Sequence, residues 1–353
     1  MYSKSVKISQ EYEILIKNFS LFENKTTIIS GLIPSQLFHE NFFKKLIIYT
    51  QYYDVYKMMY KKNIKKIILN LTEHYNPFYK YQQLIYFWTK NKSENNLQLT
   101  YLLSCISSKC IIYIIGKKKS GINSVPKTLK KNVTFKKKSY ARSCCLYKGN
   151  IKKKPQFLFQ KFIKTYTWKN IRINSLPGVF GYKKIDKGSK LLISTFKKDI
   201  QGKILDVGSG TGIIGIALAK NNPKINLTLT DNYNLSIWCS KNNLLNNNIK
   251  GKVLLSDVYS NIKEKYNLII SNPPIHSDRK INLKVLNIII KKSKKYLKKN
   301  GEIRIVVNSF ISCELIFNKN KMKYEIIKKN KSYKVIKAFI KNKFNIFNTR
   351  SGT

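Results

Sequence analysis

Asparagine and proline residues that follow a short apolar run are suited to binding a planar amino group. Residues 267–270, Asn-Leu-Ile-Ile, have the apolar and β-branched character of a strand, and Asn272, Pro273 and Pro274 come soon after it. The two prolines stiffen the backbone and remove two N–H donors, so the Pro273 carbonyl and the Asn272 side-chain oxygen are available to accept from one amine. This arrangement indicates methyl transfer to nitrogen. An ordinary turn after a strand has the same pattern.

A glycine-rich segment further upstream is typical of a loop that holds a nucleotide-like cofactor. Residues 203–207 predict a short buried strand, residues 208–212 (Gly-Ser-Gly-Thr-Gly) predict a turn, and an apolar helix is expected to extend through Lys220. Such glycines allow close approach of a ligand, and the helix start supplies free N–H groups. A dinucleotide fingerprint needs glycine where this chain has Ile213. Because Asp206 would repel a pyrophosphate but suits an ammonium group, we expect S-adenosylmethionine; a purely structural glycine turn is the alternative.

Two further acidic residues lie at the expected ends of the next strands. Residues 226–230 are followed by Asp231, and residues 252–255 are followed by Ser256 and Asp257. In doubly wound sheets an acid at the second strand end accepts the ribose hydroxyls, and the next strand end is placed to meet the adenine amino group. Either acid alone is also a common helix N-cap. The cofactor-binding residues predicted in this way are Asp206, Gly208, Gly210, Asp231 and Asp257.

Longer stretches in both halves of the chain support these motifs. In the C-terminal half they are residues 176–180, 188–192, 205–212, 223–229, 269–274 with His276, and 301–306; in the N-terminal half they are residues 86–92, 116–121 and 141–147. With these stretches the chain resembles the ribosomal RNA small subunit methyltransferase C family over nearly its whole length. The N-terminal matches best distinguish this family from other N-methyltransferases, because many N-methyltransferases share the cofactor loop but few share that first domain.

The resemblance implies an α/β protein with two tandem Rossmann-like methyltransferase domains. Residues 1–165 would form a degenerate copy for folding and RNA docking, and residues 166–353 a seven-stranded class I domain that uses S-adenosylmethionine. The implied reaction is N2-methylation of one guanine of 16S rRNA within the small ribosomal subunit.

In that reaction Asn272 and Pro273 would be catalytic, whereas Pro274 and Ile275 would bind the substrate base. The family has an aromatic residue where this chain has Ile275. An aliphatic side chain can cover a base but loses a stacking contribution of about 1 kcal/mol.

Two other functions are compatible with the motifs taken alone. One is methylation of another planar amine, such as adenine or a protein glutamine amide, and the N-terminal resemblance argues against it. The other is a weakened, nonenzymatic RNA-binding assembly factor. The intact Asp206, Asp231 and Asn272 argue against the second, because decay should remove such residues first.

The N-terminal half predicts a second α/β domain, with strands at residues 25–30, 65–71 and 109–115. The segment 116–121 has lysines where a cofactor loop needs small residues, so we expect no cofactor there. Residues 88–90, Trp-Thr-Lys, are interpreted as the relic of an Asn-Pro-Pro corner.

Trp88, with Lys90 and Lys92, is a candidate RNA contact; its alternative is a place in the core. A linker with Pro155 and a strand at residues 167–173 would lead into the second domain, which would end in a hairpin at residues 324–340.

Length and charge are consistent with this interpretation. The 353 residues suit two domains, and the formal net charge of +51 favours polyanionic partners. Only five of the 68 basic residues are arginine, and the lysines are spread throughout, so the charge indicates compatibility with RNA rather than specificity.

The spacings of the six cysteines and three histidines predict no metal site. The chain also has no apolar signal core and no apolar run of membrane-spanning length. We therefore expect a cytoplasmic protein with no membrane association. We also expect a monomer.

Overall fold

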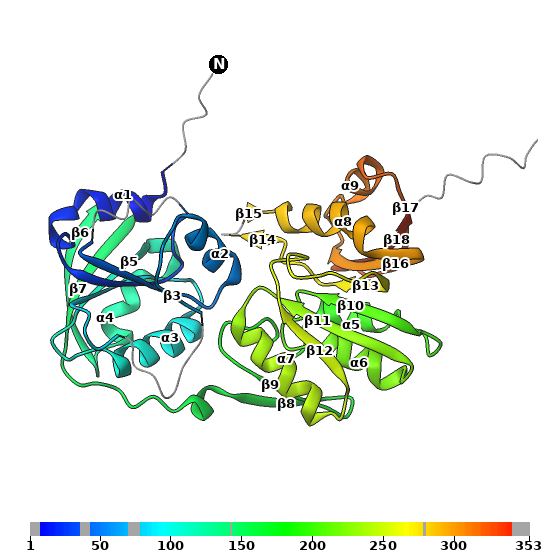
Figure 1. Cartoon of the computed structure of the whole chain (residues 1–353), viewed down its shortest axis with the longest axis horizontal. Coiled ribbons are helices and arrows are strands. Elements are labelled where there is room, and N and C mark those ends of the chain that lie inside the picture. The colour runs from blue at the N-terminus through cyan, green and yellow to red at the C-terminus, as the bar shows by residue number, and fades with distance from the viewer. Residues whose placement is uncertain (1–7, 36–42, 70–77, 142, 278–279, 341–353) are drawn as a thin grey trace, which may run out of the picture. The chain divides into compact units, whose positions relative to one another are not determined.

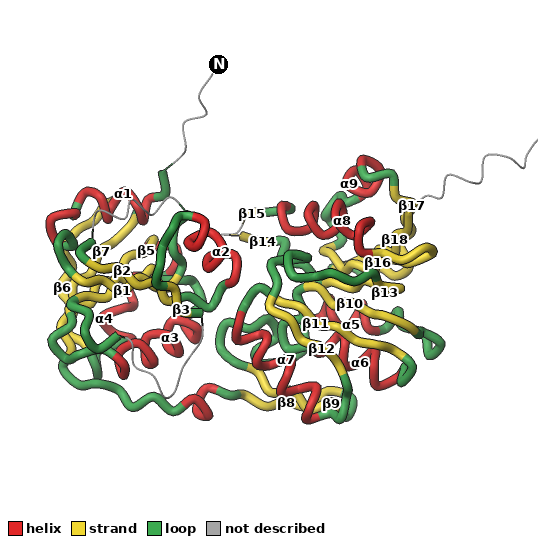
Figure 2. Tube along the Cα trace, in the orientation of Figure 1, coloured by secondary structure: helices red, strands yellow, loops and turns green. Residues whose placement is uncertain are grey.

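The chain folds into two α/β units. The computed structural model describes residues 8–35, 43–69, 78–141, 143–277 and 280–340, and the chain divides into compact units at Met1–Phe162 and Ile163–Thr353 (Figure 1). Each unit contains a seven-stranded mixed sheet with helices packed against it (Figure 2). The predicted fold class, two tandem Rossmann-like α/β domains, is confirmed.

The sheet of the N-terminal unit has the strand order β3-β2-β1-β4-β5-β7-β6. Strands β1 to β5 pair in parallel, and β7 runs antiparallel to β5 and β6. The strands are β1 (Thr26–Gly31), β2 (Lys45–Tyr49), β3 (Ile67–Ile68), β4 (Gln83–Phe87), β5 (Ile111–Lys117), β6 (Val133–Ala141) and β7 (Cys144–Ile151). The helices are α1 (Gln10–Lys17), α2 (Tyr53–Lys61), α3 (Lys92–Cys105) and α4 (Val125–Thr128).

The sheet of the C-terminal unit has the order β12-β11-β10-β13-β16-β18-β17, with β18 antiparallel to its two neighbours. Its strands are β10 (Gly202–Val207), β11 (Ile225–Asp231), β12 (Gly251–Leu255), β13 (Tyr266–Ser271), β16 (Leu297–Asn308), β17 (Met322–Lys329) and β18 (Tyr333–Ile340). The helices are α5 (Lys187–Ile193), α6 (Ile213–Asn221), α7 (Asn234–Asn246), α8 (Lys284–Tyr296) and α9 (Glu314–Lys319). Two small hairpins are formed by β8 (Lys164–Trp168) with β9 (Ile171–Ser175) and by β14 (His276–Ser277) with β15 (Lys280–Ile281).

The two sheets correspond strand for strand, since β1 to β5 occupy the places of β10, β11, β12, β13 and β16. The loop after β1 is therefore the counterpart of the glycine loop after β10. It begins Leu32-Ile33-Pro34 and not with a run of glycines. Likewise, Trp88 follows β4 in the place that Asn272 takes after β13.

Apolar side chains cover both faces of the C-terminal sheet, as expected for buried parallel strands. Leu205 and Val207 of β10 belong to a cluster that includes residues of α8 and α9. Ile204 belongs to a second cluster with residues of α5, α6 and α7. The sheet is therefore a middle layer between two sets of helices (Figure 1).

One expected element is wrong and another is shorter than expected. The strand predicted at residues 167–173 is instead the β8–β9 turn, where Lys169 and Asn170 have φ of 45° and 60°. Alternating apolar residues continue on both sides of this turn, which concealed it in the sequence. The strand expected at residues 65–71 is reduced to β3, and its last two residues lie outside the described part of the chain. The terminal hairpin at residues 324–340 is confirmed by β17 and β18.

We expect Gly31 to be irreplaceable for steric reasons. Gly31 has a φ of +86°, and a Cβ atom there would lie 2.1 Å from the Phe87 carbonyl oxygen. Gly121 is a matched control, because its φ is +79° but its Cβ would meet only Lys92 Cε, at 3.8 Å. Gly121→Ala should cost about 1–2 kcal/mol of unfolding free energy, the cost of a left-handed alanine, and Gly31→Ala should cost clearly more.

Urea unfolding of the full chain, followed by Trp88 fluorescence after Trp168→Phe and Trp238→Phe, measures both costs. Equal costs for the two substitutions would contradict the steric argument.

Candidate active site

Strand register brings three strand ends to one edge of the C-terminal sheet. Val207, the last residue of β10, pairs with Thr230 on β11 and with Ser271 on β13. The first two amides of the glycine loop donate to the Thr230 carbonyl at 2.8 and 2.9 Å, and Ser271 Oγ donates to the Val207 carbonyl at 2.7 Å. The loop therefore begins between the strand ends that carry Asp231 and Asn272.

The glycine loop has a backbone conformation that residues with a side chain rarely adopt. Gly208, Gly210 and Gly212 have φ of 75°, 57° and 81°. A Cβ atom on Gly208 would meet nothing within 4 Å, whereas one on Gly210 would lie 3.2 Å from the Phe180 carbonyl oxygen. The loop therefore faces open space at Gly208, where a ligand can approach the backbone closely.

Asp206 is buried beneath this loop, with no exposed surface. Its Oδ2 accepts from the Gly215 amide of α6 at 3.1 Å, and its Oδ1 has no hydrogen-bond partner among the described residues. Burial raises the pKa of this carboxyl to about 7; the Gly215 amide opposes the rise, and the charge of Asp231 adds to it. The described contact of Asp206 is therefore with the start of α6, and its expected role toward the ammonium group of a cofactor stays a prediction.

Asp231 connects the end of β11 to the glycine loop. Its Oδ2 accepts from the Gly210 amide at 2.8 Å, and its Oδ1 accepts from the Tyr233 amide at 2.9 Å. Desolvation raises the pKa of Asp231, and these backbone donors oppose the rise. The carboxylate thus holds the loop in shape, and its role toward a ribose stays a prediction.

Asp257 lies beyond the end of β12 and is partly exposed. Its amide donates to Ser260 Oγ at 3.1 Å, so the residue begins a turn. The turn continues through Val258, which has a φ of 53°, unusual for a β-branched residue. No cleft described below includes Asp257, and its contact with adenine stays a prediction.

Asn272 contacts two side chains of the segment that begins α5. Asn272 Nδ2 donates to Asp186 Oδ2 at 3.2 Å and to Ser189 Oγ at 3.0 Å. Asp186 is the N-cap of α5, because its Oδ2 also accepts from the Ser189 amide at 3.1 Å. The strand-end asparagine is therefore joined to a helix start 86 residues earlier in the chain.

The residues that follow Asn272 have different environments. Pro273 is buried and Pro274 is exposed. The side chain of Ile275 is only 6% exposed and packs in the cluster that includes Leu205 and Val207. Its expected place against a substrate base stays a prediction, and this burial weighs against it.

A small cleft brings the glycine loop and Asn272 together. Its lining comes from the segment before α5, the starts of α5 and α6, the glycine loop and the Asn-Pro-Pro corner, and includes Phe180, Asp186, Ser189, Gly208, Thr211 and Asn272. Asp206, Gly210, Asp231, Asp257 and the residues from Pro273 to Ile275 do not line it. A second hollow, beside Asn318 and Phe339, contains no predicted site residue.

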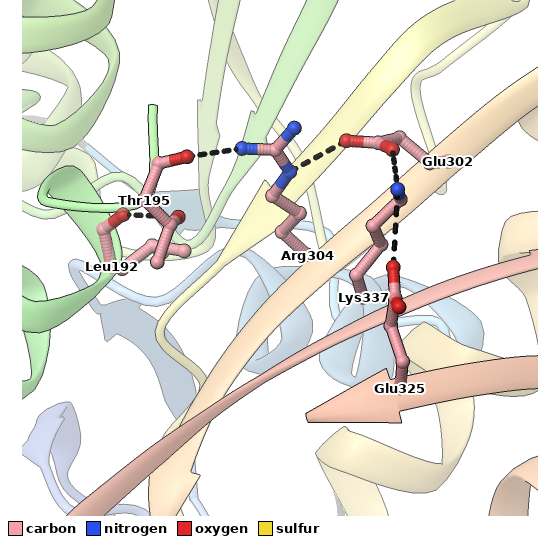
Figure 3. Close-up of polar contacts among 6 residues, drawn as sticks. All are labelled: Leu192, Thr195, Glu302, Arg304, Glu325 and Lys337. Carbon is pink, nitrogen blue, oxygen red and sulfur yellow. Dashed lines mark hydrogen bonds and ion pairs between the residues drawn. The ribbon is translucent and has the colours of Figure 1, made fainter. Parts of the chain in front are cut away.

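An ionic chain holds the other end of α5. Arg304 Nη1 donates to the carbonyl of Thr195, just beyond α5, at 2.8 Å, and Arg304 Nε donates to Glu302. Lys337 lies between Glu302 and Glu325, at 3.5 and 3.2 Å. Figure 3 shows this chain of contacts running from Thr195 through β16 and β18 to β17. Helix α5 is thus tied to the sheet at its C-terminal side and to Asn272 at its N-terminal side.

Sequence reasoning assigned no role to Asp186 and Ser189. A local signal was present, because an aspartate three residues before a serine at a helix start is a typical N-cap pattern. Gly188 is a further sign of close packing, since a Cβ there would lie 2.9 Å from Asp186 Oδ2 and 3.1 Å from the Tyr333 ring. The contact with Asn272 depends on tertiary structure and has no local signature.

The corresponding corner of the N-terminal unit is filled by packing. Trp88 is 3% exposed, and its Nε1 donates to the Ser120 carbonyl at 3.2 Å. Trp88 is therefore a core residue, as the alternative interpretation has it, and its side chain is not placed to contact RNA. A Cβ atom on Gly116 would lie 2.9 Å from the Trp88 Cβ and 3.3 Å from Ile122.

No group of three or more His, Cys, Asp or Glu residues within the described ranges is arranged to hold a metal ion. No helix in the described part of the chain is long and apolar enough to cross a membrane.

The sheet order, the glycine loop and the Asn-Pro-Pro corner define a methyltransferase of the α/β class. Comparison with protein families agrees with this class. Residues 170–337 match the methyltransferase small domain, and residues 12–166 match the methyltransferase small domain N-terminal family.

Full-length relatives define the family more narrowly. The ribosomal RNA small subunit methyltransferase C of Buchnera aphidicola subsp. Cinara cedri is 60% identical over 94% of this chain and 97% of its own length. The protein of the same name from Buchnera aphidicola subsp. Acyrthosiphon pisum is 39% identical over 95% of this chain and 99% of its own length. The chain belongs to the ribosomal RNA small subunit methyltransferase C family.

A solved structure shares the whole fold. The T. thermophilus 16S rRNA N2 methyltransferase, in complex with AdoMet and guanosine, superimposes with a TM-score of 0.83 over 95% of this chain and 93% of its own, at 17% identity. The likeness therefore extends over both α/β units.

We expect Asp206 to make stability depend on pH. Burial raises its pKa from 3.8 to about 7, whereas the unfolded chain leaves it exposed. A carboxyl with a raised pKa contributes to the free energy of unfolding. This contribution is fully present below about pH 4 and is lost as the pH rises through about 7. The unfolding free energy of the wild type relative to Asp206→Asn should therefore fall by a few kcal/mol over this range.

Urea unfolding at several pH values, followed by tryptophan fluorescence, measures this difference. Asp199→Asn, the same substitution at an exposed aspartate, is the control. A pH-independent difference for Asp206→Asn would refute the expectation.

Proposed function

We infer that this chain transfers a methyl group from S-adenosylmethionine to the exocyclic N2 of a guanine in 16S rRNA of the small ribosomal subunit. The observation that carries this inference is the 60% identity with a ribosomal RNA small subunit methyltransferase C over 94% of the chain. A cleft where Asn272 meets the glycine loop supports it, because that cleft combines a cofactor loop with a polar group suited to an amine.

The residues around the glycine loop fit S-adenosylmethionine. Open space over Gly208 allows a ligand to contact the backbone, and Asp206 Oδ1 is an unused acceptor beneath the loop. We propose that Gly208 and Gly210 contact the cofactor, that Asp206 favours its ammonium group, and that Asp231 and Asp257 hold its ribose and adenine. Bound S-adenosylmethionine supplies an electrophilic methyl group.

Asn272 and Pro273 act on the amine in this proposal. A guanine amine is a poor nucleophile because its lone pair is delocalised into the ring. Acceptors at Asn272 Oδ1 and the Pro273 carbonyl draw its two hydrogens and favour a pyramidal nitrogen with an oriented lone pair. The methylated nitrogen is acidic enough to lose its proton to water, so no strong protein base is required.

Substrate access depends on the RNA. The amine of a paired guanine is inaccessible, so the base must be unpaired or turned out of its stack. We propose that Pro274, which is exposed, lies beside the base, with Ile275 behind it. The N-terminal unit would serve folding and RNA docking, with the net charge of +51 favouring contact with phosphates.

Two alternatives are less well supported. An adenine or protein glutamine amine would also suit the Asn-Pro-Pro corner, but the N-terminal family match extends over residues 12–166, a region that a shared corner does not explain. A nonenzymatic assembly factor would have no need to keep Asn272 paired with Asp186 and Ser189 beside the glycine loop.

We place the enzyme in the cytoplasm as a monomer. The cysteines Cys105, Cys110, Cys144, Cys145, Cys239 and Cys313 are free thiols in the structure, which is consistent with a reducing compartment. The substrate, a ribosomal subunit, is found in the same compartment.

The first test of this proposal is the substitution Asn272→Ala. It should lower methyl transfer by roughly 10² or more, the scale of losing one preorganised polar group, while S-adenosylmethionine affinity stays within a few-fold. The assay is transfer of tritiated methyl groups to small subunits, with chromatography of the product nucleosides.

Asn246→Ala, at an exposed asparagine of α7, is the matched control and should retain full rate. A wild-type product other than N2-methylguanosine would overturn the reaction, and near-full activity of Asn272→Ala would overturn the role of Asn272.

The second test concerns Asp231. Asp231→Ala should weaken S-adenosylmethionine binding by about 10- to 100-fold, because charge-assisted hydrogen bonds to the ribose and the tie to the Gly210 amide are both lost. Asp231→Asn retains an acceptor for that amide and should weaken binding less.

Calorimetry on the full chain gives both affinities, with Asp199→Ala as the exposed control. Unchanged affinity in Asp231→Ala would remove the ribose assignment.

A further inference from the structure

The two ends of the Asn272 side-chain amide face different surroundings. Both of its described hydrogen bonds use Nδ2, which donates to Asp186 Oδ2 at 3.2 Å and to Ser189 Oγ at 3.0 Å. No described hydrogen bond engages Asn272 Oδ1. Asn272, Asp186 and Ser189 all line the same cleft, and Oδ1 is the end of the amide that the described contacts leave for a ligand.

Asp186 favours this orientation because the oxygens of a carboxylate accept hydrogen bonds and do not donate them. If the amide of Asn272 were reversed, its Oδ1 would lie about 3 Å from a carboxylate oxygen, and two acceptors would face each other without a proton. Its NH₂ group would then face the cleft and would oppose the NH₂ group of a guanine. One orientation of Asn272 is therefore suited to an amine substrate, and the other is not.

We propose that Asp186 and Ser189 are positioning residues that fix Asn272 with its carbonyl oxygen toward the reacting amine. This proposal rests on the function proposed above and assigns the two side chains that make Asn272 an acceptor. Ser189 is 2% exposed, so its hydroxyl has little access to water that would otherwise compete for the amide.

Asp186 is itself held from several directions. Its Oδ2 accepts from the Ser189 amide at 3.1 Å, which fixes it as the N-cap of α5. The Tyr333 ring packs over the adjacent Gly188, and Asp186 contributes, after burial, to the raised pKa of Tyr333. The carboxylate therefore has few alternative positions, and its orientation is passed on to Asn272.

The test is Asp186→Asn in the full-length enzyme. Asparagine is as good an N-cap as aspartate, so α5 should be retained, but its NH₂ group is able to donate to a reversed Asn272. We expect kcat for methyl transfer to small subunits to fall by about 10- to 100-fold, the scale of a misplaced catalytic group. KM for the subunits and affinity for S-adenosylmethionine should stay within about threefold.

Ser189→Ala is the second variant, with Ser194→Ala as its matched control. Ser194 follows α5, is exposed, and donates only locally, to the Leu191 carbonyl at 2.7 Å. We expect a several-fold loss of kcat in Ser189→Ala and no loss in Ser194→Ala. This pair keeps the proposal testable if Asp186→Asn does not fold.

A double-mutant cycle with Asn272→Ala separates positioning from a general structural role. If Asp186 and Ser189 act through Asn272, adding Asp186→Asn or Ser189→Ala to Asn272→Ala should not lower kcat further. Additive losses, or single variants with wild-type kcat, would overturn the proposal. Failure of the wild type to form N2-methylguanosine would instead overturn the proposed function, because the cycle measures methyl transfer to whichever amine is the acceptor.

Discussion

Parallel pairing of β10 with β11 and β13 is the constraint on which the candidate site depends. The pairing of Val207 with Thr230 and with Ser271 places the glycine loop, Asp231 and Asn272 at one edge of the sheet. A shift of one residue in either pairing would turn the strand-end side chains to the opposite face. Burial of both faces of the sheet opposes such a shift, so the apolar core also determines the geometry of the polar edge.

The second determinant of the candidate site is helix α5. It precedes β10, the first strand of the C-terminal sheet, in the chain and contributes residues to the lining of the cleft. Asp186 at its start contacts Asn272, and Thr195 beyond its end accepts from Arg304. This short helix has seven residues and would be unstable alone. Its stability in the protein comes from these contacts and from Leu191 and Leu192, which are buried in the core.

Sequence patterns were sufficient for the order of the elements around the site. The strands that end at Val207 and Ser271 and the hairpin formed by β17 and β18 follow from apolar runs with turn residues between them. The patterns did not reveal which side chains meet across the fold. Asp206 contacts α6, and Asn272 contacts a residue 86 positions away; neither contact has a local signature.

The burial of Ile275 also could not be predicted from the sequence. An apolar residue after two prolines suits either the core or a ligand surface, and only the structure shows it among the core residues. The turn at Lys169 and Asn170 was not predicted because lysine is not a residue type that indicates a left-handed backbone. Local propensity therefore predicted elements, while tertiary packing decided the directions of the side chains.

The packing of Trp88 has an evolutionary consequence. In the N-terminal unit this side chain occupies the corner that corresponds to Asn272, and Gly116 lies so close to it that a Cβ atom there would be 2.9 Å from the Trp88 Cβ. Replacing Trp88 with a small polar residue would leave a cavity that costs about 3–5 kcal/mol before any ligand contact was gained. Acquisition of a second catalytic corner would therefore require several simultaneous substitutions, because the first single substitution would destabilise the unit before it gained a function.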